Sequence, residues 1–148
     1  MYQLAQVNIA RMLAPLSDPL MAGFVARLDT INALADGSPG FLWRLQTEEG
    51  NATTLQPYED DLILVNLSLW ASLSDLLAFV YKSQHRSVLQ QRHQWFERFE
   101  GPYLALWWVP AGHIPSVEEA KERLAYLHAH GETPYAFSFK KPFPSSAL

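Results

Sequence analysis

The chain has no cysteine, and its charge shows no excess of basic residues. Without thiols, its 148 residues cannot form a disulfide, a thiolate nucleophile or a thiolate metal site, which is compatible with a reducing compartment. Its 11 Lys and Arg residues are outnumbered by 15 Asp and Glu residues, giving a formal net charge of −4, and no basic cluster is longer than Lys140-Lys141. Nucleic-acid binding is therefore not expected, because a phosphate backbone would meet no attractive field.

Long apolar runs are missing as well. No charge-free apolar stretch approaches the roughly 18 residues that a membrane span requires. The N-terminus also lacks the basic and apolar regions of a signal peptide. We therefore expect a cytoplasmic protein with no membrane partner.

Aromatic residues, by contrast, make up 13% of the chain, within a hydrophobic fraction of 49%. A chain of this length has enough apolar surface for one core but not for two. We expect a single domain over residues 1–140. Residues 141–148 are polar and interrupted by proline, and we do not expect this C-terminal tail to be ordered.

Alternating side chains predict the strands. In residues 2–9, Leu4, Gln6 and Asn8 share one face, while Ala5, Val7 and Ile9 share the other. Residues 61–69 alternate in the same way and place Asn66 and Ser68 on the less apolar face. The segments 41–47, 103–109 and, more briefly, 135–139 are also predicted to be strands. The sheet should thus have one apolar face and one mixed face, the latter carrying Gln6, Asn8, Asn66 and Ser68.

Capping residues mark the helices. Asp18 followed by Pro19 predicts a helix start, and the apolar stripe after it ends at Gly37. Ser72 with Asp75, and Ser116 with Glu119, have the spacing of capping boxes. The last helix should end at Gly131, and the polar segment 83–99 could form a further helix with uncertain boundaries.

The resulting order, β-α-β-β-α-β-α-β, indicates an α+β fold with helices on one face of an antiparallel sheet. The other face must then be wetted by solvent or covered by a partner. We expect that exposed face to be the mixed one.

Several segments resemble an uncharacterised bacterial family, domain-of-unknown-function family 3291, within the dimeric α+β barrel superfamily of antibiotic biosynthesis monooxygenase-like proteins. The resemblance covers nearly the whole chain and rests on the following runs: LAQVNIA at 4–10, GFLWR at 40–44, VNLSLW at 65–70, YKSQH at 81–85, LWWVPAGH at 106–113 and TPYAF at 133–137. It implies a ferredoxin-like sheet and a homodimer in which two such sheets pair into a barrel. It brings no established reaction, since superfamily members include cofactor-free monooxygenases, haem-binding degraders and enzymes without oxygen chemistry.

Three residues are the candidate catalytic groups. The resemblance places His85 where several superfamily members have a histidine, and its imidazole could act as a general base or as an axial haem ligand. Alternatively, it only caps or hydrogen-bonds the end of its helix. Asn66 and Arg44 could stabilise a developing oxyanion. Both lie on the less apolar side of their strands, where they could instead satisfy other buried polar groups.

Eight further residues are candidates for substrate binding. Asn8 and Ser68 share the mixed face with Asn66, and they too could satisfy each other across strands. Trp107 and Trp108 point to opposite faces, so one belongs to the core and the other to a ligand or dimer surface. Tyr81 and Trp95 could line the same pocket, although aromatic residues at helical spacing are more often part of the core. His113, in the loop before the last helix, is a separate candidate that could instead only hydrogen-bond its turn. The full set is Asn8, Ser68, Trp43, Tyr81, Trp95, Trp107, Trp108 and His113.

No metal site is expected, because the five histidines show no recognised ligand spacing. The leading expectation is a small-molecule-binding protein similar to cofactor-free monooxygenases, acting on a planar apolar substrate in an aromatic cavity. Two alternatives remain open: a haem-binding protein, and a non-catalytic dimeric binding module.

Overall fold

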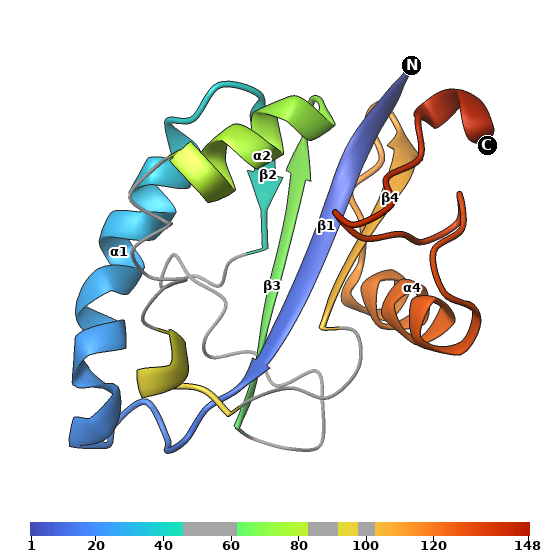
Figure 1. Ribbon diagram of the computed structural model, residues 1–148. Helices are drawn as coiled ribbons and strands as arrows, with labels where there is room; N and C mark the ends of the chain where they lie inside the picture. The colour runs from blue at the N-terminus through green and yellow to red at the C-terminus, as the bar shows by residue number, and fades with distance from the viewer. Residues whose placement is uncertain (46–61, 83–91, 98–102) are drawn as a thin grey trace.

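The computed structural model of the chain describes residues 1–45, 62–82, 92–97 and 103–148. Four strands form one antiparallel sheet in the order β2-β3-β1-β4 (Figure 1). Their bounds are Tyr2–Arg11 for β1, Phe41–Arg44 for β2, Ile63–Trp70 for β3 and Leu104–Pro110 for β4. With a helix after β1 and another after β3, this is the ferredoxin-like arrangement. The predicted α+β class and antiparallel sheet are confirmed.

The helices begin at the predicted caps. The 3₁₀ turn η1 (Pro19–Met21) leads into α1 (Ala22–Asp36), and the Asp18 side chain accepts a hydrogen bond from the Leu20 amide at 2.9 Å. In α2 (Leu73–Lys82) and α4 (Val117–His130), the hydroxyls of Ser72 and Ser116 each accept from the backbone amide three residues later, at 3.1 Å. Two further 3₁₀ turns are η2 (Arg92–Gln94) and η3 (Ser145–Ala147).

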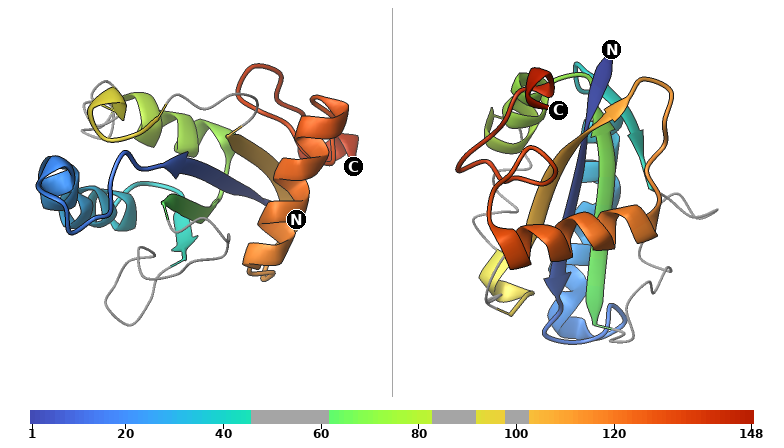
Figure 2. Two further views of the ribbon diagram at one scale, coloured as in Figure 1. Left: turned by 90° about the horizontal axis from the view of Figure 1, so that it is seen from below. Right: turned by 90° about the vertical axis from the view of Figure 1, so that its right-hand side faces the viewer.

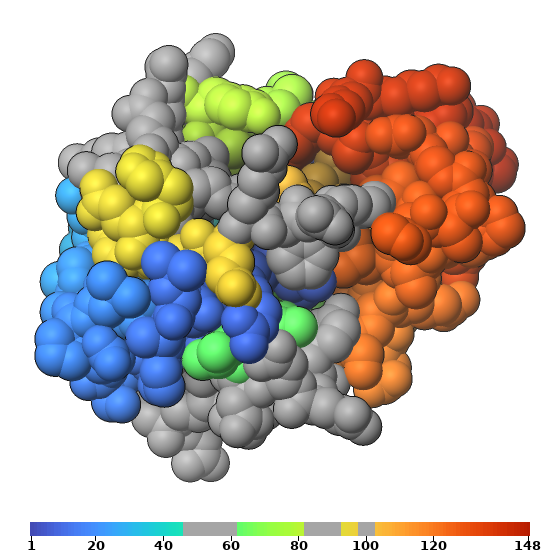
Figure 3. Space-filling view, turned by 60° about the horizontal axis from the view of Figure 1, so that its bottom comes forward, coloured from blue at the N-terminus to red at the C-terminus, as the bar shows by residue number. Residues whose placement is uncertain are grey.

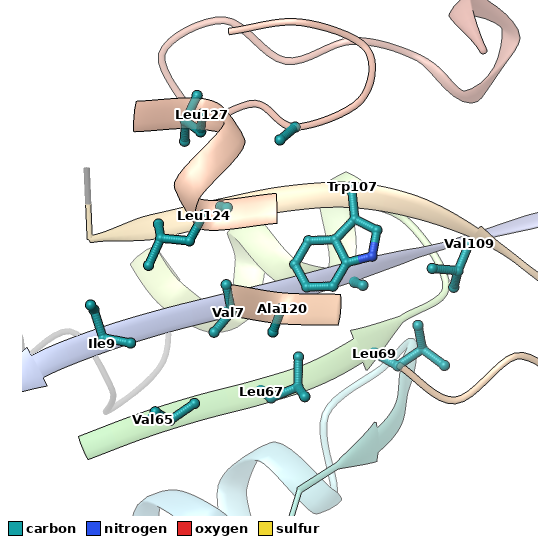
Figure 4. Packing of buried hydrophobic residues seen from close by; sticks show 13 residues of the cluster. Val7, Ile9, Val65, Leu67, Leu69, Trp107, Val109, Ala120, Leu124 and Leu127 are labelled. Carbon is teal, nitrogen blue, oxygen red and sulfur yellow. The ribbon is translucent and has the colours of Figure 1, made fainter. Parts of the chain in front are cut away.

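Helices of the same chain cover both faces of the sheet. α1 and α2 pack on the mixed face, where Leu4, Trp70 and Leu106 form one cluster with Ala35, Leu76 and Phe79. α4 lies across the opposite, apolar face, and Figure 2 shows it in front of the strands with α1 behind them. Ala120, Leu124 and Leu127 of α4 pack there against strand residues that include Val7, Leu67 and Trp107 (Figure 4).

This arrangement corrects one expectation. The predicted helices on one face are present as α1 and α2, but the face they cover is the mixed one, which we expected to meet solvent or a partner. The physical reason is that α4 supplies its own apolar stripe for the apolar face, so the chain itself buries both surfaces.

A third cluster closes the end of the sheet where β1 finishes. Met12, Met21, Trp95 and Phe96 are buried together there. The Leu13 amide donates to the Trp95 carbonyl at 2.8 Å. Figure 3 shows residues 92–97, in yellow, directly against the blue segment that follows β1.

The C-terminal part differs from the expected strand. Residues 135–139 form no named strand, although Phe137 pairs with Leu106 of β4 as an isolated bridge. Within the tail, Phe143 packs on Phe137, and its carbonyl accepts from the Trp108 indole at 2.8 Å. These contacts hold the tail against the β4 edge. No helix in the described part of the chain is long and apolar enough to cross a membrane.

Candidate functional site

A cavity of about 260 Å³ lies between the mixed face of the sheet and the two helices α1 and α2. Its floor comes from β1, β2 and β3, and α1 and α2 provide the walls. Most of its lining is apolar, and its aromatic members include Phe24, Phe41, Trp70, Phe79, Phe96 and Phe139. Large apolar walls with a few polar groups are typical of small-molecule sites.

The polar groups of the floor form one hydrogen-bonded ladder across β1 and β3. The Gln6 amide nitrogen donates to Asn66 Oδ1 and to Ser68 Oγ, both at 2.9 Å. Asn8 Nδ2 donates to Gln6 Oε1 at 2.8 Å, and Trp70 Nε1 donates to Ser68 Oγ at 2.9 Å. The strand register places Gln6 opposite Ser68 and Asn8 opposite Asn66, which explains why these side chains meet.

Ser68 keeps one hydrogen-bonding group for the cavity. Its side chain lines the cavity and the residue is 6% exposed. Its oxygen already accepts from Trp70 and Gln6, so both lone pairs are occupied while the hydroxyl hydrogen still requires an acceptor. Within residues 1–45, 62–82, 92–97 and 103–148, no acceptor for it is found. A ligand oxygen in the cavity could satisfy this donor.

Two arginines add positive charge to the lining. Arg44 of β2 and Arg27 of α1 both line the cavity. Arg44 Nε donates to Asp36 Oδ1 at 2.8 Å, and Nη2 lies 3.4 Å from Oδ2. Among the described lining residues, none is Asp, Glu, Lys or His. The arginines are therefore the charged groups that this lining presents to a ligand.

The structure brings five of the predicted site residues together. Asn66 and Arg44, predicted as catalytic, line the cavity with Asn8, Ser68 and Tyr81. The expectation that the polar residues satisfy each other across adjacent strands holds for Asn8, Asn66 and Ser68. His85 lies outside the described residues.

The other five predicted residues lie elsewhere. Trp43 packs against the cluster beneath α4, and Trp107 is fully buried in that cluster. Trp95 belongs to the cluster at the end of β1, next to the cavity residue Phe24. Trp108 and His113 line an open groove beside the start of α4. The expected division of Trp107 and Trp108 between two faces is present, with Trp107 as the core residue.

His113 has a structural partner in that groove. Its Nε2 lies 2.7 Å from Glu119 Oε1, and the other oxygen of Glu119 accepts from Trp107 Nε1 at 2.8 Å. Burial by itself raises the pKa of the Glu119 carboxyl. The hydrogen bonds from His113 and Trp107, together with the charges of His113 and Arg123, outweigh burial and hold this pKa below its ordinary value. The network ties the loop before α4 to the sheet.

Gln6 and Arg27 are among the cavity residues that the sequence reasoning missed. Gln6 lies at the centre of the ladder and is 4% exposed. Its position between Leu4 and Asn8 on the mixed face could have identified it as a candidate site residue. Arg27 precedes the cavity residue Ile31 by four positions, which places both on one side of α1. Its charge made a solvent-facing position the natural assumption.

The described residues offer no cluster of metal ligands, and those that line the cavity offer no imidazole or thioether to a haem iron. Among the described residues, no three His, Asp or Glu side chains gather in a way that could hold a metal ion. The described cavity lining contains no His or Met that could serve as an axial haem ligand, and tyrosine is the one such residue type present.

Comparisons with known proteins agree with this fold. A family model described as "Domain of unknown function (DUF3291)" matches residues 3–148. No curated protein gives a significant match. The crystal structure of NE2512, a protein of unknown function from Nitrosomonas europaea, has a TM-score of 0.51 and 13% identity, covering 78% of this chain and 97% of that one. SnoaB, a cofactor-independent oxygenase from Streptomyces nogalater, has a TM-score of 0.47 and 14% identity, covering 77% and 97%. The likeness to NE2512 concerns the fold alone.

Proposed function

We propose that this chain, which belongs to the family described as "Domain of unknown function (DUF3291)", binds a small, planar, largely apolar molecule between its sheet and the helices α1 and α2. The observation that carries the proposal is the cavity itself. Aromatic walls enclose a floor of hydrogen-bonding side chains, and all of these groups come from one chain.

The size of the cavity limits the ligand. At about 260 Å³ it lies just below the usual range of ligand pockets, about 300 to 1,000 Å³. A molecule of one or two fused rings suits this space. Phe and Trp faces favour flat rings, and the Asn66 and Ser68 side chains would hydrogen-bond a polar edge.

Turnover is the second part of the proposal and depends on His85. In a reaction of the cofactor-free monooxygenase kind, His85 would act as the base, while Asn66 and Arg44 would stabilise the developing oxyanion. Asn66 and Arg44 share the cavity, which supports this assignment. Without a contribution from His85, the same cavity describes a non-catalytic binding module.

The experiment uses the five Trp indole N–H signals of the ¹⁵N-labelled protein as site-specific reporters. Trp70 lines the cavity and Trp107 lies under α4 on the opposite face. A panel of planar probes, 2-naphthol, 2-naphthamide and 1,4-naphthoquinone, should shift the Trp70 signal and leave the Trp107 signal in place. Oxygen uptake with the same probes, in wild type and His85→Ala, tests turnover separately from binding.

A cavity-filling variant provides the control. Ala35 is buried and lines the cavity, so Ala35→Leu should occupy the ligand's space and abolish the Trp70 shift. Ala129→Leu places the same extra atoms on the exposed side of α4 and should bind like wild type. If no probe moves Trp70 at saturating concentration, or if Ala35→Leu binds unchanged in a folded state, the proposal is wrong.

A further inference from the structure

We infer that the ligand of the cavity carries a negative charge and is a planar aromatic carboxylate, held at the end of the cavity where Arg44 and Ser68 pair across β2 and β3. The inference rests on the proposed function, because it specifies which kind of small planar molecule the cavity selects. Three features of the described residues lead to it.

The first feature is the sign of the charge. The chain as a whole has 15 acidic against 11 basic residues, yet the described lining of the cavity contains Arg27 and Arg44 and no carboxylate. The charged side chains of the described lining are therefore all cationic, in a protein whose formal net charge is −4. An anion gains from entering the cavity, because the surrounding low dielectric strengthens its attraction to a guanidinium.

The second feature is the position of Arg44. The β2–β3 register places Arg44 directly opposite Ser68, so the guanidinium and the hydroxyl rise from neighbouring points on the same sheet face. The Ser68 hydroxyl hydrogen lacks an acceptor among the described residues, as shown above. A guanidinium and a hydroxyl that start from paired positions on one sheet face can each donate to one oxygen of a bound carboxylate.

The third feature is the partner that Arg44 has now. Arg44 already holds a carboxylate, that of Asp36, and its own side chain is only 14% exposed while that of Asp36 is 50% exposed. Asp36 is the last residue of α1, where the partial negative charge of a helix C-terminus disfavours an acidic side chain. A ligand carboxylate inside the cavity can thus compete with Asp36 for the guanidinium, or share it.

The test compares two probes of nearly equal shape, 2-naphthoate and its neutral amide, 2-naphthamide, by calorimetric titration at pH 7. Wild type should bind the naphthoate at least about tenfold more tightly, since hydrogen bonds to charged groups exceed neutral ones by that order. Arg44→Gln should bring the naphthoate affinity down to that of the amide. Asp36→Asn should instead strengthen naphthoate binding several-fold and leave naphthamide binding unchanged, because it removes the competing carboxylate.

Controls separate this inference from the proposed function. Arg11→Gln removes an arginine whose ion pair with Glu97 lies outside the cavity, and it should preserve the preference for naphthoate. The Trp indole spectrum reports whether each variant is folded, and Asp36→Asn keeps the test decisive should Arg44→Gln unfold. If neither probe shifts Trp70, the proposed function itself fails. If naphthamide binds as tightly as naphthoate, or if the preference survives Arg44→Gln, the cavity binds planar molecules but our assignment of an anionic ligand is overturned.

Discussion

The hydroxyl oxygen of Ser68 accepts a hydrogen bond from the indole nitrogen of Trp70 at 2.9 Å, on the floor of a cavity enclosed by the chain's own helices. An indole N–H can only donate, so this bond assigns Ser68 the role of acceptor. The Gln6 amide donates to the same oxygen. One serine thus orients both the aromatic wall and the polar ladder.

Ser68→Ala should destabilise the fold by about 1 to 3 kcal/mol, because it leaves the buried donors of Trp70 and Gln6 without their acceptor. Chemical denaturation measures the change, and the Trp70 indole signal should move in the folded variant. Ser146→Ala, at an exposed site in the tail, is the matched control and should stay within about 0.5 kcal/mol of wild type. Equal stability of both variants would show that the ladder does not depend on this hydroxyl.

Gly40 should tolerate alanine less well than Gly112, although both have positive φ, +79° and +92°. A Cβ on Gly40 would overlap the Asp75 carboxylate, which accepts from Ser72 at the start of α2, whereas a Cβ on Gly112 meets nothing within 4 Å. Gly112→Ala should cost about 1 kcal/mol for the backbone alone. Gly40→Ala should cost at least about 2 kcal/mol, since the cap of α2 is disturbed as well. If the denaturation curves of the two variants coincide, the Asp75 carboxylate is not the reason that Gly40 resists substitution.

Glu119 should make stability depend on acidic pH. Its pKa is lower in the folded chain than in the unfolded chain, so its contribution is complete above the unfolded value of about 4.3 and is lost as the pH falls through the folded pKa. Glu119→Gln should flatten this part of the stability profile between about pH 4.3 and the onset of acid unfolding. Glu118→Gln, at the exposed neighbouring position, serves as the control and should keep the wild-type profile. Thermal melts of wild type and both variants across this pH range show whether only Glu119→Gln flattens the profile.

The homodimer stays a prediction, and the position of α4 on the sheet limits how two copies can pair. Pairing two sheets through the apolar face would require α4 to leave it, because Leu124 and its neighbours occupy that face. Leu124→Ala should therefore cost about 2 to 5 kcal/mol within a single chain, while Leu148→Ala at an exposed site should be near neutral.

Light scattering gives the molar mass, and the concentration dependence of the melting temperature shows whether assembly is coupled to folding. A Leu124→Ala variant as stable as wild type would mean that α4 is not held on the sheet in solution. A melting temperature that rises with concentration would show that a second copy contributes to the folded state.

The sequence by itself determined the local structure. The alternation in residues 2–9 indicated the strand and its two faces, because side chains in a strand point to opposite sides in turn. The caps at Asp18, Ser72 and Ser116 marked helix starts, because each oxygen satisfies a backbone amide only a few residues away. Contacts of this kind depend on neighbours along the chain and can be read from it. The family resemblance added the ferredoxin-like arrangement of the sheet to these local predictions.

The tertiary structure alone decided which surfaces meet. Nothing in the alternation of β1 says whether Gln6 and Asn8 face a helix, solvent or a second copy; that follows from α1 and α2 packing over them while α4 packs on the other side. The pairing of Arg44 with Ser68 depends on the β2–β3 register, and the hydrogen bond between Ser68 and Gln6 joins residues 62 positions apart. The cavity and its charge arise from such distant pairings, which are set by packing free energy over the whole chain and not by any local pattern.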